Sequence, residues 1–298
     1  MPVTIPRQRR LYPLALTALL LASPAWGEVS LHERYPMLKS GLGTTLPGTT
    51  ITLASAEQGE VLSAEVSSIL HYPFDTVATA LARAENWCQF MPLHFNIKAC
   101  TYETREGGER LNVYSGRKIY QPPEDSYQMA YRFETIQQNS KRLSLRLSAE
   151  DGPAGTRDYR IELDALEVED GTMLYMRSSY RPSLLSSILT QGYLTTLGRN
   201  KVGFSHIEED GKSRLVRGKR GVIERNVMRY HLAIDAYLST QTLPRESRHE
   251  AALERWFSLN DGYPKQLDEM SKEDYFEGKR REWQNQLQLQ QALIKGNP

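Results

Sequence analysis

Six runs of alternating apolar residues between Phe95 and Arg181 most constrain what this chain can fold into. Side chains two positions apart lie on the same face of a strand, so this period indicates half-buried strands. Short strands joined by tight turns pair with their sequence neighbours, so the pattern predicts an antiparallel meander. The turn-forming segments between the runs are Gly107-Gly108, Pro122-Pro123, Asn139, Asp151-Gly152-Pro153 and Asp170-Gly171.

Helical patterns flank these strands. A strand at Val61 to Leu70 is followed by a helix from about Phe74 to Asn86, and a long helix is predicted from about Gly221 to Ser239. Two more helical patterns follow Pro244, and the second ends in glutamine-rich residues. The fold class is therefore α+β. The long helix carries one broad apolar stripe, made of Ile223, Val227, Tyr230, Ile234, Tyr237 and Leu238.

The N-terminus has the pattern of a secretory signal peptide. Arginines precede an apolar stretch from Leu11 to Ala22, and Ala25-Trp26-Gly27 provides a small-x-small cleavage site. We expect cleavage after Gly27 and a soluble protein in the periplasm or secreted from the cell. The whole chain has 37 Lys and Arg against 36 Asp and Glu, and this balance does not favour a nucleic-acid partner.

Cys88 and Cys100 are the only cysteines in the sequence. In an oxidising compartment an isolated pair favours a disulfide over two free thiols. A metal site that also uses His94 is the alternative, but no second ligand pair follows at metal-site spacing. No metal and no cofactor are expected.

The order strand, helix, six strands and long helix resembles the START-like superfamily, also called the SRPBCC or helix-grip fold. Trp87, Phe90 and Pro92 match an aromatic-to-proline step that members of the family often carry where the first helix passes into the next strand. The resemblance implies a curved antiparallel sheet wrapped around the last helix, with a cavity between them. The Cys88–Cys100 disulfide would then fix the bend that closes one end of the sheet.

The resemblance also sets expected domain boundaries. Residues 1–27 would be the signal peptide, 28–59 an extended N-terminal arm, and 60–243 the START-like domain. An insertion at about 183–218 replaces the short turn that is usual in the family. A C-terminal helical extension, residues 244–298, follows the domain.

Two groups of residues are candidate binding residues. The first would line the cavity, although apolar rows of this kind are also plain core and the arginines could pair with carboxylates: Arg117, Tyr127, Met129, Tyr131, Phe133, Tyr175, Arg177, Tyr230 and Ile234. The second belongs to a basic run that suits a phospholipid headgroup or an anionic membrane surface, but could also be a solvated face: Lys212, Arg214, Arg217, Lys219 and Arg220.

Three functions are compatible with these features. The first is a carrier or binding protein for a lipid or another hydrophobic ligand, with the insertion as a lid. The second is a cyclase- or hydrolase-type enzyme in the same cavity, in which a tyrosine such as Tyr131, an arginine or His231 supplies proton transfer. The third is an envelope scaffold whose C-terminal helices dock a protein partner through Trp256, Phe257, Tyr275 and Trp283.

Overall fold

The structure, a computed structural model, describes residues 31–40, 50–196, 198–209 and 211–296. These residues belong to one compact unit, Leu31–Pro298. The expected signal peptide, residues 1–27, lies outside the described residues, so export stays a prediction. In the part of the chain that the structure describes, no helix combines the length and the apolar character needed to cross a bilayer.

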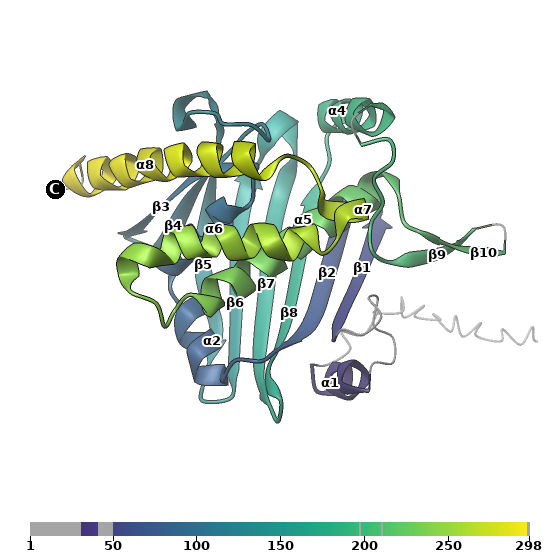
Figure 1. Cartoon of the computed structure of the whole chain (residues 1–298), viewed down its shortest axis with the longest axis horizontal. Coiled ribbons are helices and arrows are strands. Elements are labelled where there is room, and N and C mark those ends of the chain that lie inside the picture. The colour runs from purple at the N-terminus through teal and green to yellow at the C-terminus, as the bar shows by residue number, and fades with distance from the viewer. Residues whose placement is uncertain (1–30, 41–49, 197, 210, 297–298) are drawn as a thin grey trace, which may run out of the picture. The chain divides into compact units, whose positions relative to one another are not determined.

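An eight-stranded antiparallel sheet forms the centre of the fold (Figure 1). Its strands lie in the order β1-β2-β8-β7-β6-β5-β4-β3. From β3 to β8 each strand pairs with the next one in sequence, which confirms the expected six-stranded meander. The strands are β1 (Ile51–Gln58), β2 (Val61–Leu70), β3 (Ile97–Arg105), β4 (Gly108–Ser115), β5 (Tyr127–Gln138), β6 (Arg142–Asp151), β7 (Arg157–Val168) and β8 (Gly171–Arg181).

The segment expected to be an extended arm is instead structured. Helix α1 (Leu31–Lys39) packs on one face of the sheet, where its Leu31 and Leu38 contact Ile69 and Met173. Strand β1 pairs along its whole length with β2 and extends the sheet by one strand. Both elements bury apolar side chains, which is why the segment folds onto the sheet despite the Gly- and Pro-containing stretch between them. The face that α1 covers is called the outer face below.

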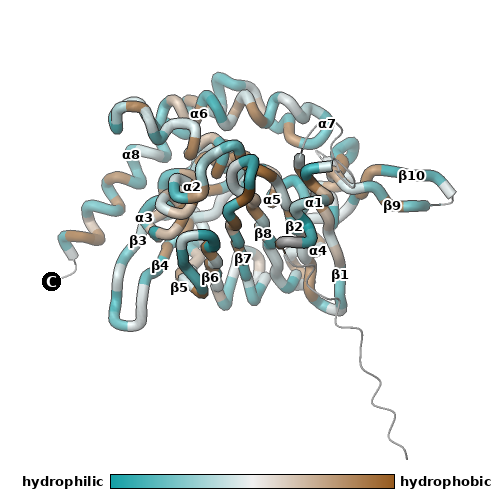
Figure 2. Tube along the Cα trace, turned by 90° about the horizontal axis from the view of Figure 1, so that it is seen from below, coloured by the Kyte–Doolittle hydropathy of each residue, from teal (hydrophilic) through white to brown (hydrophobic). Residues whose placement is uncertain are grey.

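The long helix α5 (Gly218–Ser239) packs on the opposite, inner face of the sheet. Helix α6 (Arg245–Asp261) packs on α5, so that sheet, α5 and α6 form successive layers (Figure 2). Because α5 is covered on both sides, it buries residues around most of its circumference, far more than the single expected stripe. The C-terminal helices therefore complete the core and are not a separate appendage. They also include α7 (Pro264–Leu267) and α8 (Lys272–Gly296).

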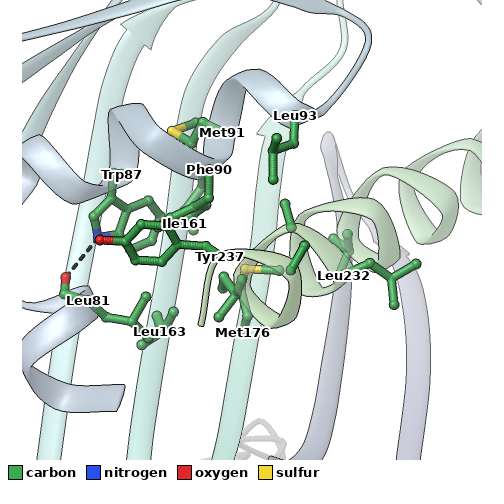
Figure 3. Close-up of a cluster of buried hydrophobic side chains, with 14 of the residues drawn as sticks. Leu81, Trp87, Phe90, Met91, Leu93, Ile161, Leu163, Met176, Leu232 and Tyr237 are labelled. Atoms are coloured by element: carbon green, nitrogen blue, oxygen red, sulfur yellow. Dashed lines mark hydrogen bonds between the residues drawn. The ribbon is translucent and has the colours of Figure 1, made fainter. Parts of the chain in front are cut away.

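The aromatic bend that contains Trp87 and Phe90 closes the end of the sheet near the C-terminus of α5. The single expected helix is two short helices, α2 (Phe74–Leu81) and α3 (Ala84–Phe90), followed by a 3₁₀ turn η1 (Met91–Leu93). The Trp87 indole N–H donates to the carbonyl of Leu81 at 2.8 Å (Figure 3). The ring of Phe90 lies 5.1 Å from that of Trp87 and 5.7 Å from that of Tyr237 on α5. The bend thus joins the sheet to the helix.

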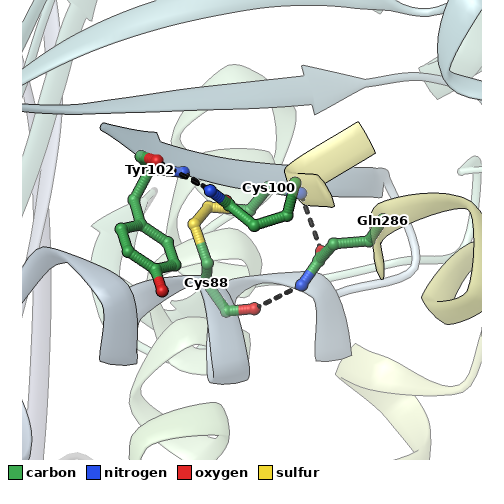
Figure 4. The surroundings of a disulfide bond; sticks show 5 residues. Cys88, Cys100, Tyr102 and Gln286 are labelled. Carbon is green, nitrogen blue, oxygen red and sulfur yellow. Dashed lines mark hydrogen bonds between the residues drawn. A yellow bond between two sulfur atoms is a disulfide. The ribbon is translucent and has the colours of Figure 1, made fainter. Parts of the chain in front are cut away.

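The Cys88–Cys100 disulfide is formed, with 4.9 Å between the two Cα atoms, as expected from the sequence (Figure 4). It ties α3 to the edge strand β3. Gln286 of α8 bridges the same two residues, accepting from the Cys100 N–H at 2.8 Å and donating to the Cys88 carbonyl at 2.9 Å. Helix α8 thus covers the backbone edge of β3, which would otherwise expose unpaired polar groups.

The insertion between β8 and α5 contains helix α4 (Leu184–Thr195) and a hairpin of β9 (His206–Glu209) and β10 (Lys212–Leu215). The hairpin projects beyond β1 (Figures 1 and 2). The fully buried carboxylate of Glu224 on α5 anchors the insertion. It accepts from the backbone N–H groups of Phe204 at 2.7 Å and Ser205 at 3.0 Å, and from the hydroxyl of Ser55 in β1 at 2.6 Å.

Candidate functional site

The space between the inner face and α5 is filled by side chains. The expected cavity-lining residues Met129, Tyr131, Phe133 and Ile234 do come together there, but all four are buried in one continuous apolar cluster. Tyr230 packs against this cluster from α5, and its ring stacks on that of His94 at 5.0 Å. None of the hollows described below has the four buried residues in its lining. In this structure they act as core.

Two of the expected lining residues lie on the wrong face of the sheet for an inner cavity. Tyr175 and Arg177 point to the outer face, together with Met173, which α1 covers. The Tyr175 hydroxyl donates to Glu65 at 2.9 Å, and the Arg34 guanidinium lies 4.7 Å from the Tyr175 ring. Burial and the Glu65 carboxylate raise the pKa of the Tyr175 phenol. These contacts place Tyr175 in the packing between α1 and the sheet.

Arg117 and Tyr127 are also not where the alternating pattern placed them. Strand β4 ends at Ser115, so Arg117 lies in the following loop, where it is exposed and its Nε donates to Gln121 at 3.4 Å. Tyr127 begins β5 and is 38% exposed. The inward-facing row therefore begins only at Met129.

A polar hollow of about 990 Å³ lies mainly on the outer face of β5 to β8. Tyr127 and Arg177 are in its lining. Arginines and carboxylates alternate across it, and several are already paired, such as Arg181 with Asp158 at 3.1 Å. With its charges balanced in this way, the hollow has no strong preference for an anion or a cation.

A second hollow, of about 920 Å³, lies between the insertion and α7 and is called the basic hollow. No acidic residue is among the described residues that line it, and neither Arg217 nor Lys265 forms an ion pair with any described residue. Arg214 is paired with Glu209 at 3.4 Å, an exposed contact that water screens. The lining combines four cations with apolar side chains: Asn200, Lys201, Val202, Arg214, Leu215, Arg217, Pro264 and Lys265.

A buried group of cations lies next to the basic hollow, on the side of α5. The Arg225 guanidinium donates to the carbonyl of Val202, a lining residue, at 3.3 Å. Arg229, one turn further along α5, pairs with Glu269 at 3.1 Å, and Lys118 pairs with the same carboxylate. Burial would raise the pKa of Glu269, but Arg229, Lys118 and Lys201 hold it below its ordinary value.

Cations outnumber carboxylates in this region. Burial lowers the pKa of Arg229 to about 10, although Glu269 opposes the shift, so Arg229 stays charged at neutral pH. The Nε atoms of both Arg225 and Arg229 have no hydrogen-bond partner among the described residues. Glu224 and Asp268 also lie in this region, but the cations of this group and of the hollow outnumber the carboxylates, and the resulting positive field favours an anion in the adjoining hollow.

Only some of the residues expected to contact a lipid headgroup lie in the basic hollow. Arg214 and Arg217 line it, whereas Lys212 is exposed on the projecting hairpin. Lys219 and Arg220 point elsewhere: Lys219 donates to Ser187 of α4 at 3.2 Å, and Arg220 donates to Ser55 of β1 at 3.0 Å. Sequence reasoning missed Lys201 and Lys265, which lie 64 positions apart in the chain. No local sequence pattern indicates that these two lysines lie close together, because their proximity depends on α7 packing next to the insertion.

The residues considered for proton transfer in an enzyme, His231 and Tyr131, are buried in the core. His231 is buried, its Nδ1 has no partner among the described residues, and Asp235 binds Tyr72 at 3.2 Å and Arg255 at 3.4 Å. Burial raises the pKa of the Tyr131 phenol well above its ordinary value, which makes it a poor proton donor.

The aromatic residues of the C-terminal helices pack within the chain. Trp256 and Tyr275 are both 2% exposed and stack at 5.1 Å, and Phe257 lies 5.5 Å from Tyr275. Trp283 stacks on His249 at 4.1 Å. These contacts join α6 to α8 and bury Trp256 and Tyr275 completely, whereas Phe257 and Trp283 stay partly exposed.

No protein-family model and no curated protein sequence matches this chain. Similar solved structures include a STAR-related lipid transfer protein from Xanthomonas axonopodis, with 14% identity, a TM-score of 0.36, and coverage of 49% of this chain and 86% of that one. Ara h 8.0201 matches with 10% identity, a TM-score of 0.35, and coverage of 61% and 99%. A protein from Rhizobium leguminosarum matches with 14% identity, a TM-score of 0.31, and coverage of 50% and 92%.

The assignment of the fold rests on this chain's own topology. Strand β2 is followed by two short helices and the six-stranded meander, and β8 returns to pair with β2. Helix α5 then crosses the inner face of the sheet. On the strand order and the position of α5, the chain has a START-like, helix-grip fold.

Proposed function

We propose that the protein binds an amphipathic ligand with an anionic headgroup, such as a lipid, and that the headgroup occupies the basic hollow. The observation that carries this proposal is the convergence of Lys201, Arg214, Arg217 and Lys265 on one hollow, with no carboxylate among the described residues of its lining. Arg217 and Lys265 form no ion pair with a described residue, so these two cations can bind a phosphate or carboxylate without first breaking an ion pair.

The walls of the basic hollow suit the rest of such a ligand. Val202, Leu215 and Pro264 contribute apolar surface next to the cations. A glycerol backbone or the first part of an acyl chain would gain about 25 cal/mol per Å² of apolar surface that it covers. Because the interface between α5 and the sheet is filled, we place the ligand at the insertion and not inside the core.

The proposal is tested with a soluble short-chain phosphatidic acid, dihexanoyl phosphatidic acid, by isothermal titration calorimetry. We expect binding by the wild type and a loss of at least about tenfold in affinity in the Arg217→Ala/Lys265→Ala variant, since each charge-assisted contact contributes about 1.5–3 kcal/mol. The Lys141→Ala/Lys295→Ala variant removes two exposed lysines far from the hollow in sequence and is the matched control.

Native mass spectrometry of protein purified without detergent provides a second measurement. A co-purifying lipid that is lost from the Arg217→Ala/Lys265→Ala variant supports the proposal. Equal affinity of this variant and the wild type for the short-chain ligand would refute it, as would the absence of binding by the wild type.

A further inference from the structure

Helix α4 presents an unusually apolar surface to solvent. Leu184, Leu185, Ile188 and Leu189 are 81%, 55%, 59% and 58% exposed, and no residue of this helix is buried. Positions i, i+1, i+4 and i+5 lie on one side of an α-helix, so the four side chains form a single patch, which we call the α4 face. Soluble proteins rarely expose large aliphatic side chains side by side unless the surface binds something.

The helix is held in place through its polar side. Ser187 accepts a hydrogen bond from Lys219 of α5 at 3.2 Å, and the Tyr193 hydroxyl lies 3.4 Å from the Arg225 guanidinium. At its N-terminus Ser183 and Ser186 form a capping box, which stabilises the first turn locally. The helix is therefore anchored on one side while the α4 face stays uncovered among the described residues.

Cations predominate around α4: the Glu269 carboxylate accepts from the Tyr193 hydroxyl at 3.4 Å, but it is paired with Arg229 and Lys118. The helix itself has no charged residue, and residues 182–205 contain Arg199 and Lys201 but no Asp or Glu. Three further cations contact the helix: Lys219 through Ser187, Arg225 through the Tyr193 hydroxyl, and Lys118, whose Nζ lies 4.6 Å from the Tyr193 ring. The neighbour of Lys118 in sequence, Ile119, is itself 62% exposed. An apolar face bordered by cations complements a surface that is apolar in depth and anionic at its boundary.

We propose that the α4 face docks the protein onto an anionic lipid bilayer. The four aliphatic side chains would enter the boundary between headgroups and acyl chains, with α4 lying in the plane of the membrane. Lys219, Lys118 and the cations that follow α4 would stay at the level of the lipid phosphates. This inference rests on α4 and does not require the basic hollow to bind a ligand.

The test is co-sedimentation of the full chain with phosphatidylcholine vesicles that do or do not contain phosphatidylglycerol. We expect binding to the phosphatidylglycerol vesicles, weakened by salt, and little binding to phosphatidylcholine alone. The Leu185→Gln/Ile188→Gln/Leu189→Gln variant should bind at least about tenfold more weakly, since glutamine keeps the helix propensity but cannot bury in the membrane. All proteins carry the same N-terminal residues, so the difference reports α4 alone.

The matched control replaces exposed aliphatic residues elsewhere. Ile136 and Ile294 are 53% and 64% exposed, and the Ile136→Gln/Ile294→Gln variant should bind the vesicles as the wild type does. Circular dichroism checks that both variants are folded. Equal binding by the α4 variant and the wild type would overturn the proposal, and so would the absence of vesicle binding by the wild type.

Two further outcomes separate this proposal from its alternatives. If the wild type forms dimers in light scattering and the α4 variant is monomeric with unchanged vesicle binding, the α4 face contacts a second copy and the proposal is wrong. If the α4 variant loses vesicle binding but keeps its affinity for dihexanoyl phosphatidic acid, docking and headgroup binding are separate properties and the proposal stands.

Discussion

The side-chain amide of Gln290 pairs with both backbone groups of Tyr102: its Oε1 accepts from the Tyr102 N–H at 2.9 Å and its Nε2 donates to the Tyr102 carbonyl at 3.0 Å. Gln286, one turn earlier on α8, forms the equivalent hydrogen bonds with the Cys100 N–H and the Cys88 carbonyl. Four residues of helix rise about 6 Å, close to the rise of about 6.6 Å for two residues of strand. Two glutamines spaced by four can therefore cover alternate backbone groups along the edge of β3.

Replacement of Gln290 by alanine should destabilise the protein. The variant leaves the Tyr102 N–H and carbonyl without their partner, and we expect a loss of roughly 1–2 kcal/mol in the free energy of unfolding. Urea denaturation measures this loss. The Gln288→Ala substitution on the exposed side of the same helix is the control and should change stability by less than about 0.5 kcal/mol. Equal stability of the two variants would show that the edge contact is energetically unimportant.

Gly203 should not tolerate a side chain, because the insertion packs closely against α5 there. A Cβ atom at this position would lie 2.5 Å from the Glu224 carboxylate and 2.5 Å from a methyl group of Val216. We expect the Gly203→Ala variant to lose about 1–3 kcal/mol in the free energy of unfolding. Limited proteolysis should also cleave the insertion faster than in the wild type.

Gly192 provides the matched control for this substitution. It lies within α4, and a Cβ added there would have no neighbour within 4 Å. Alanine is a better helix former than glycine, so Gly192→Ala should leave stability unchanged or raise it by up to about 1 kcal/mol. Destabilisation by both substitutions would show that close packing at Gly203 is not the cause.

Reduction of the Cys88–Cys100 disulfide should lower the free energy of unfolding by about 3 kcal/mol, because the bond restricts the unfolded chain. Urea denaturation with and without dithiothreitol measures the difference. The Cys88→Ala/Cys100→Ala variant is the control, since its stability should not respond to the reductant. A wild type that is equally insensitive would contradict the prediction.

The buried histidines should make the protein sensitive to acid. Burial lowers the pKa of His231 to about 4, from an ordinary value of 6.5. The unfolded chain then binds a proton at a pH where the folded chain does not, so stability falls as the pH drops from about 6.5 to about 4, by up to roughly 3 kcal/mol for this group. Burial also lowers the pKa of His249 to about 4 and that of His94 well below its ordinary value.

The contribution of His231 is measured by urea denaturation at several pH values. The His231→Gln variant should lose less stability than the wild type between pH 6.5 and pH 4, whatever its stability at neutral pH. The His71→Gln substitution, at an exposed histidine, should keep the pH dependence of the wild type. A pH dependence that is identical in all three proteins would rule out His231 as a source of the acid sensitivity.

The sequence by itself determined the six-stranded meander, the long helix on the sheet and the disulfide. These follow from local signals, namely the period of two in the strands, the turn-forming pairs between them, the apolar stripe of α5, and a single pair of cysteines. The period of two also groups Tyr175 and Arg177 with Met173 on one face of β8. It could not say which face, because apolar Met173 is covered by α1 from outside and not by α5 from within.

Only the tertiary structure decided whether the sheet and α5 enclose a space. That outcome depends on the volumes of side chains from several elements, and here Met129, Tyr131, Phe133 and Ile234 fill the interface. The basic hollow likewise needs Lys201 and Lys265 to meet across 64 positions, and the α4 face is recognisable only once the rest of the insertion is seen to leave it uncovered. Periodicity fixes the side of an element on which a residue lies, but not what packs against that side.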